Sequence, residues 1–170
     1  MNFIYPLITM IDKVISSVIK PFVVLISIAI ASLLSFGIFT RSILNEPVFG
    51  LEELILMAAM WLYMLGAVLA SKDRSHLSAD FIQVFVENQK IISFMHLVAT
   101  TISLIMASFF AVWSYDLMIW AFEKSQTTTV FQLPWYLSQS SLFVASALFI
   151  FYLVRDFFTD LDSFKNSDSK

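Results

Sequence analysis

The chain has little of what most soluble and catalytic proteins depend on. It contains no cysteine, three glycines and four prolines in 170 residues, and charged residues make up 14% of the sequence. The absence of cysteine excludes disulfides and thiol chemistry. A net charge of −3 provides no basic surface for a nucleic acid, so none is expected as a partner. The scarcity of glycine and proline leaves long segments without helix breakers.

The chain is rich in hydrophobic residues, which make up 59% of the sequence. Four stretches without Asp, Glu, Lys or Arg cover residues 21–40, 54–71, 91–115 and 134–154. A helix of about 20 apolar residues crosses a hydrocarbon core about 30 Å thick. The continuous runs argue against a membrane β-barrel, whose strands alternate in polarity. We therefore predict an all-α integral membrane protein, with four transmembrane helices forming one membrane domain over 1–170.

The basic residues indicate the orientation of these spans. An even number of crossings places both termini on one side, and eight of the ten Lys and Arg residues then share that side: Lys13, Lys20, Lys72, Arg74, Lys90, Arg155, Lys165 and Lys170. Only Arg41 and Lys124 fall on the other side. Loops that stay in the cytoplasm carry an excess of basic residues. We expect a multi-pass membrane protein with cytoplasmic N and C termini, a short outer loop around Asn45 to Glu53 and a longer one from Asp116 to Leu133.

Three further segments are not expected to span the membrane. Residues 4–19 and 75–87 carry apolar side chains at helical spacing among polar ones, a pattern typical of helices that lie at the membrane surface. The first of them could also lead directly into the first span. The final residues, 163–170, are small, polar and charged, and we expect them to be disordered.

The spans offer little for catalysis or ion binding. His96 is their only histidine, and a hydrogen-bonded packing role is the simplest interpretation of it. A second histidine, His76, allows the weak alternative of a bis-histidine haem in a redox anchor subunit. No pattern of catalytic or metal-ligating side chains is visible, so we expect no enzyme activity, no metal and no cofactor in this chain.

Small and polar residues follow one face of several spans and predict helix contacts. They are Ala59, Gly66 and Ala70 on the second span, Ser93, His96, Thr100 and Ser103 on the third, and Gln139 on the fourth. Such residues let helices approach closely and supply hydrogen bonds between them. The same stripes could instead dock a membrane partner. In a homo-oligomeric channel or carrier, the stripe on the third span would line a path between copies.

The segment from Arg41 to Asp80 has the most distinctive pattern. Arg41 is followed by Gly50-Leu51-Glu52-Glu53-Leu54, by Trp61 and Gly66-Ala67, and by Lys72-Asp73-Arg74-Ser75-His76-Leu77, with Asp80 four residues further on. This pattern resembles the small membrane subunit of TRAP transporters, the DctQ type, and the chain as a whole looks closest to the sialic acid systems. Chain length and the number of spans also match.

The resemblance implies a non-catalytic subunit of a tripartite, sodium-coupled transporter for organic acids in the bacterial inner membrane. An extracytoplasmic substrate-binding protein delivers the solute, and the large TRAP membrane subunit holds the sodium and substrate sites. The small subunit would scaffold the large one and help to dock the binding protein.

Several residues receive candidate roles on this basis. We expect Arg41, Glu52, Glu53 and Trp61 to contact a partner, although the two glutamates could instead cap the second helix. Arg74, His76 and Asp80 would form a cytoplasmic turn near lipid headgroups or at the large subunit's cytoplasmic face.

Overall fold

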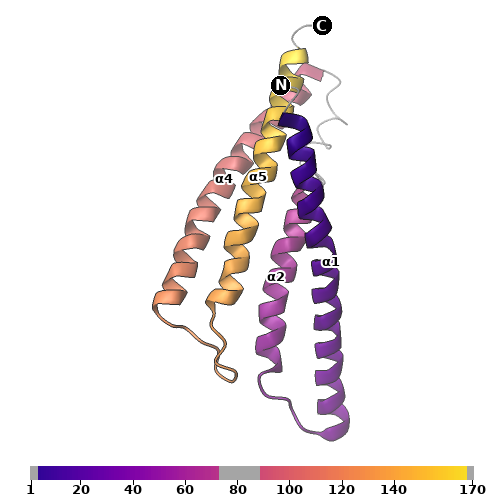
Figure 1. The fold of residues 1–170 in the computed structure, drawn as a ribbon, viewed down its shortest axis with the longest axis vertical. Coiled ribbons are helices and arrows are strands. Elements are labelled where there is room, and N and C mark those ends of the chain that lie inside the picture. Colours follow the sequence, from indigo (N-terminus) through magenta and orange to yellow (C-terminus); the bar gives the residue numbers. More distant parts are fainter. Residues whose placement is uncertain (1–3, 73–88, 168–170) are drawn as a thin grey trace.

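The computed structural model describes residues 4–72 and 89–167, and most of these residues are helical. In chain order the elements are α1 (Ile4–Phe39), the π-helical segment η1 (Thr40–Leu44), α2 (Leu51–Lys72), α4 (Gln89–Glu123) and α5 (Tyr136–Ser167) (Figure 1). Four helices are long and apolar enough to cross a membrane. The predicted all-α membrane architecture is therefore confirmed.

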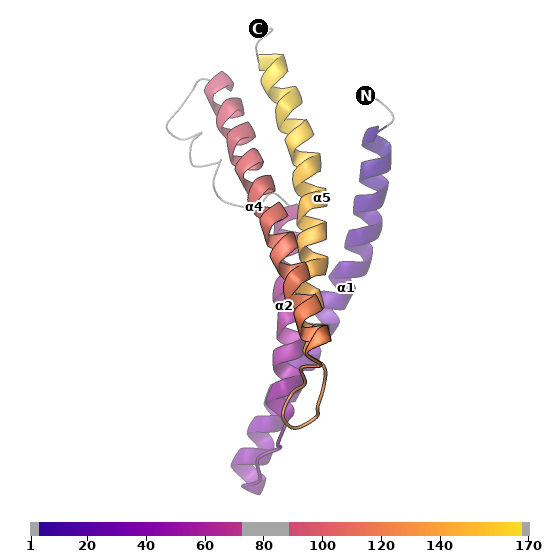
Figure 2. The same cartoon turned by 90° about the vertical axis from the view of Figure 1, so that its left-hand side faces the viewer.

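The four helices form an open row instead of a closed bundle. The order across the row is α4, α5, α2, α1, and the main contacts join each helix to its neighbour in that order. Figure 2 shows the row from its edge, with the helices spreading apart toward the end that holds the chain termini. Because the row is a single layer of helices, large apolar side chains remain exposed on it, including Leu25, Ile38 and Trp113. Lipid or a partner protein must cover this surface.

A small core lies where α1, α2 and α5 meet. Its buried members are Ile19, Leu65, Val68, Ala145 and Tyr152. Tyr152 and Val68 are fully buried, and apolar side chains such as Met64 and Phe149 pack around them. This core sets the spacing of three helices, whereas α4 is held mainly by its long contact with α5.

The N-terminal arm and the first span are one helix. α1 continues from Ile4 through Pro21 without interruption, so residues 4–19 lead directly into the span. Pro21 cannot donate a hydrogen bond to the carbonyl of Ser17, which weakens the helix at that point. Serine hydroxyls along α1 donate to carbonyls four residues earlier, as Ser27 does to Val23 over 2.8 Å. These bonds satisfy polar groups that lipid could not.

Two sequence-based boundaries are wrong. α4 extends to Glu123, so the outer loop begins after this residue and not at Asp116. α5 extends to Ser167, which makes residues 163–167 helical where a disordered tail was expected to begin. The ring of Phe164 stacks on Phe94 of α4 with centroids 6.1 Å apart, and this contact supports the end of α5. The predicted surface helix 75–87 lies outside the described residues.

Candidate functional site

Glu53 in the first turn of α2 binds the loop that joins α4 to α5. Its carboxylate accepts three hydrogen bonds: from the hydroxyl of Thr129 at 2.8 Å, from the amide of Val130 at 2.7 Å and from the amide of Phe131 at 3.0 Å. Hydrogen bonds to a charged acceptor are stronger than those between neutral groups. Glu53 thus ties the outer end of α2 to a loop nearly 80 residues away in sequence.

Gly50 makes room for the same loop. Its φ of +85° lies in the left-handed region that glycine adopts without strain. A β-carbon at Gly50 would lie 2.5 Å from the Phe131 ring and 2.9 Å from Val130. The backbone of the first loop therefore fits directly beneath the tip of the second loop. We call the two loops and their contact, residues 45–53 and 124–135, the outer platform.

The second loop of the outer platform has its own backbone structure. Thr128 donates its amide to the carbonyl of Leu133 at 2.9 Å, and Trp135 donates to Gln126 at 2.9 Å. The hydroxyl of Thr128 accepts the Leu133 amide at 3.0 Å. The loop is therefore a short hairpin, and Glu53 holds its tip.

The other predicted outer contacts remain at the surface. Arg41 lies on η1 and Glu52 on the first turn of α2, and both are exposed. Neither forms an ion pair with a residue in the described ranges. Their proposed partner contacts stay predictions. For Glu53 the structure gives a use that the sequence did not indicate, because three donors of the loop between α4 and α5 bind its carboxylate. Its proposed partner contact also stays a prediction.

Trp61 connects three helices near the middle of α2. Its indole Nε1 donates to the carbonyl of Leu137 on α5 at 3.0 Å. Its ring meets Phe22 of α1 edge to face, with centroids 6.5 Å apart. The polar end of this tryptophan is therefore used within the chain, and only part of the ring surface is left for a partner.

A second polar cluster lies at the other end of the row, where the termini are. The ammonium of Lys72 at the end of α2 is 3.4 Å from the Asp12 carboxylate of α1 and donates a short hydrogen bond to Ser16. Arg155 of α5 donates to the Lys72 carbonyl at 3.0 Å. This bond satisfies one of the carbonyls left open at a helix C-terminus, where a cation is also favoured.

Arg155 of α5 brings a third helix into this cluster. Its guanidinium donates to Asp156 at 2.8 and 2.9 Å, lies 4.0 Å from Asp12, and sits 5.1 Å from the centre of the buried Tyr152 ring. One arginine therefore joins three helices. Sequence reasoning missed this cluster, since Lys72 and Arg155 were used only to orient the spans.

The predicted stripe on α4 faces α5 at several positions. Thr100 donates to the buried Asp160 carboxylate at 2.6 Å, and Ser114 lies 3.4 Å from Ser146. Ser93 is buried and His96 half-buried, whereas Ser103 is exposed. On α5, Gln139 has a buried Oε1 that accepts no hydrogen bond from the described part of the chain. Polar side chains thus line a seam between two helices of one chain.

The predicted stripe on α2 is not a close helix contact. A β-carbon at Gly66 would meet nothing within 4 Å, and the neighbouring Tyr63 is 66% exposed. The expected close approach at Gly66 is therefore wrong within this chain. Ala59 and Ala70 on the same face are half-buried. The glycine that does permit a close approach is Gly37, whose β-carbon would lie 2.5 Å from Leu51 of α2.

The two polar clusters are separated by a length that matches a membrane. Glu53 and Lys72 stand 19 residues apart on α2, which is about 28 Å at the rise of an α-helix and close to the hydrocarbon thickness of about 30 Å. Between them α2 carries no charged residue. Within the described ranges no three His, Cys, Asp or Glu side chains gather as metal ligands. Arg74, His76 and Asp80 lie outside those ranges.

This combination of features describes a multi-pass membrane subunit without a charged group at its midplane. No curated protein matches the chain. A family model for the DctQ component of tripartite ATP-independent periplasmic transporters matches residues 23–163, which include most of each of the four helices that can span the membrane. The chain therefore belongs to the DctQ family and is a small membrane subunit of a TRAP transporter in the inner membrane.

Proposed function

We propose that this chain scaffolds the large subunit of its transporter within the bilayer. The observation that carries the proposal is the open row of helices, which has two wide apolar faces and a core confined to α1, α2 and α5. A subunit that carried solute by itself would need a polar or ionisable group near the midplane. Two polar residues of α4, Thr100 and Ser114, pack against α5 instead.

The outer platform is our proposed contact for the substrate-binding protein. Apolar side chains are exposed on it, among them Phe49 and Phe131, and the charged residues Arg41 and Glu52 lie on the adjacent η1 and α2. Glu53 and Gly50 hold the two loops together. A rigid surface loses little conformational entropy when a partner docks, which favours binding.

The remaining parts of the proposal concern ions, solute and orientation. Sodium would bind in the large subunit, with no cofactor in this chain, and the solute would be an organic acid, with sialic acid as the first candidate. The termini would face the cytoplasm, because eight of the ten basic residues belong to that side. The cluster of Asp12, Lys72 and Arg155 would then mark the cytoplasmic boundary of the bilayer.

A transport assay in vesicles tests this function. The purified chain alone, the large subunit alone and the two together are reconstituted with an inward sodium gradient, and uptake of labelled sialic acid is followed after addition of the binding protein. We expect uptake only when both membrane subunits are present. Uptake by this chain alone would contradict the scaffold role and would favour a homo-oligomeric carrier. Uptake of a different organic acid by the pair would correct the solute but not the scaffold role.

A further inference from the structure

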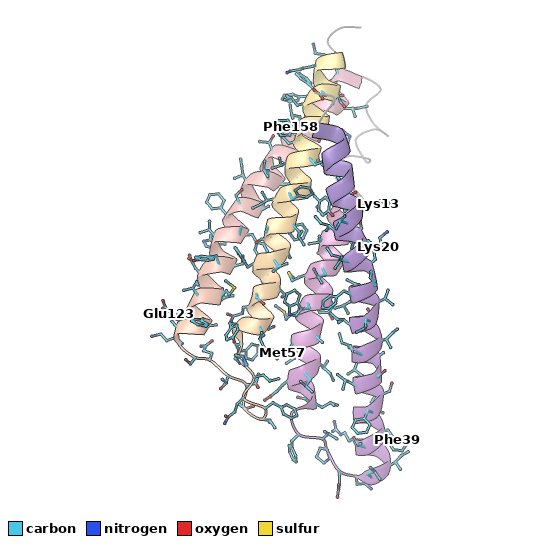
Figure 3. All side chains as sticks on the ribbon, in the orientation of Figure 1. Lys13, Lys20, Phe39, Met57, Glu123 and Phe158 are labelled. Carbon is cyan, nitrogen blue, oxygen red and sulfur yellow. The ribbon has the colours of Figure 1, made fainter. Side chains whose placement is uncertain are left out.

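Two lysines stand on the outer edge of the row, on the side of α1 that faces away from the other helices. Lys13 and Lys20 are seven residues apart and therefore share one face, with the exposed Ser17 between them. Figure 3 labels both lysines on this side of α1. Neither side chain pairs with a carboxylate in the described ranges, in contrast to Lys72, which pairs with Asp12 about 100° around α1 from Lys13.

The lysine face continues as an apolar stripe along the same helix. Val24 and Ile28 follow at helical spacing and are 57% and 62% exposed. Ile38, near the other end of α1, is 66% exposed on the same face. We call the surface of Lys13, Ser17, Lys20, Val24 and Ile28 the edge stripe. It presents two cations at one end and aliphatic side chains below them.

The level of the lysines in the membrane follows from contacts with α2. Gly37 packs against Leu51, so these residues lie at one level near the outer surface. Lys20 is then about 25 Å from that level along α1, and Lys72 is about 31 Å from it along α2. The flexible stem of lysine lets its ammonium rise toward the surface, a behaviour known as snorkelling. Both Lys13 and Lys20 can thus place their charges near the level of the Lys72 cluster.

We propose that the edge stripe binds one anionic phospholipid. The ammonium groups of Lys13 and Lys20 and the hydroxyl of Ser17 would donate to the headgroup phosphate, while Val24 and Ile28 pack against an acyl chain. Charge complementarity favours an anionic lipid, since two cations without an ion pair in the described ranges face outward and the acidic side chain of α1, Asp12, is committed to Lys72 and Arg155. The order of charge and apolar surface along α1 matches the order of headgroup and chain in a lipid.

A single engineered cysteine can report on this lipid, because the chain contains none of its own. Val24→Cys is labelled with bimane in the transporter complex purified through this chain, which is then placed in phosphatidylcholine vesicles. A small fraction of the lipid carries a nitroxide, on phosphatidylglycerol in one sample and on phosphatidylcholine in the other. Quenching of bimane measures how often each lipid visits the stripe. A second reporter, Met106→Cys on α4 at the opposite end of the row, controls for bulk composition.

We expect phosphatidylglycerol to be enriched about fivefold or more over phosphatidylcholine at Val24, since each lysine near the surface attracts anionic lipid. Met106 should show no preference. The preference should disappear in Lys13→Gln combined with Lys20→Gln. It should persist in the control pair Lys124→Gln and Lys165→Gln, which changes net charge equally at exposed sites away from the edge stripe.

Three results would overturn the proposal. Equal quenching by the two lipids in the parent protein would show that no anionic lipid is selected. A preference that survives loss of both lysines would place its origin elsewhere. Shielding of Val24 from both lipids would show that a protein covers the edge stripe. The scaffold role is judged separately, by whether the large subunit copurifies with each lysine variant.

Discussion

The carboxylate of Glu53, at the start of α2, accepts the amides of two consecutive residues, Val130 and Phe131, from the loop between α4 and α5. Because α2 and the loop between α4 and α5 belong to opposite halves of the chain, this contact fixes how the two halves meet at their outer end. The Lys72 cluster does the same at the other end, where Arg155 of α5 reaches the last carbonyl of α2. Two polar clusters thus hold the row at its two ends, in addition to the polar seam between α4 and α5.

Replacing Glu53 with glutamine should release the outer loop. The amide oxygen of glutamine can still accept from Thr129 and Val130, or from Phe131, but its NH₂ group would then face the remaining donor. We expect the exchange rate of at least one of the Val130 and Phe131 amides, measured by hydrogen exchange, to rise about tenfold as its acceptor is lost. Glu52→Gln is the matched control, because Glu52 is exposed and binds none of these groups. Equal protection in both variants would show that the contact does not hold the loop.

Gly50→Ala should destabilise the platform, whereas Gly66→Ala should not. The first change puts a β-carbon at a φ of +85° and into the Phe131 ring, and an L-residue in this region costs about 1–3 kcal/mol. The second meets open space in the middle of α2, where alanine favours the helix. Thermal unfolding in detergent measures both. A lower midpoint for Gly66→Ala than for Gly50→Ala would contradict the packing at both glycines.

Asp12→Asn should loosen the cluster at the termini. Asparagine keeps the shape but removes the charge that faces Lys72 and Arg155, both of which are largely buried at this point. At 3.4 and 4.0 Å these contacts are ion pairs and not hydrogen bonds, and leaving a partly buried cation without its counter-charge costs about 1–3 kcal/mol. We expect the free energy of unfolding in mixed micelles to fall by a comparable amount. Asp116→Asn, on the exposed outer part of α4, should leave it unchanged.

Trp61→Phe isolates one hydrogen bond between α2 and α5. The phenyl ring keeps most of the contact with Phe22 but cannot donate to the Leu137 carbonyl. Hydrogen bonds between helices in a membrane contribute about 0.6–2 kcal/mol, so a loss in that range is expected. Trp113→Phe serves as the control because Trp113 is 67% exposed. Equal stability of both variants would mean that the indole bond contributes nothing.

The sequence was sufficient to predict the helices but not how they pack. Long uncharged runs define spans because a helix in lipid satisfies its own backbone hydrogen bonds. This requirement does not depend on which helices pack beside it. The end of α4 at Glu123 was missed because Asp116 was taken as a loop residue, although apolar residues continue the helix beyond it. A charge near the end of a span does not by itself end a helix.

The contacts of the candidate site could not be read from the sequence for a different reason. Glu53 is bound by residues 129–131, and Asp12 by Lys72 and Arg155, so each contact depends on the order of helices across the row. No local sequence pattern indicates the order of the helices. Gly66 illustrates the opposite error, since a small residue at helical spacing indicated a contact that this chain does not make.

The central claim is that the open row braces a larger membrane protein. Affinity purification of this chain from its native membrane in mild detergent, followed by mass spectrometry of the bound proteins and their stoichiometry, tests it most directly. We expect a much larger multi-span subunit in equal amount. Recovery of this chain alone, as an oligomer of defined size, would contradict the claim and would assign the open faces of the row to contacts between copies.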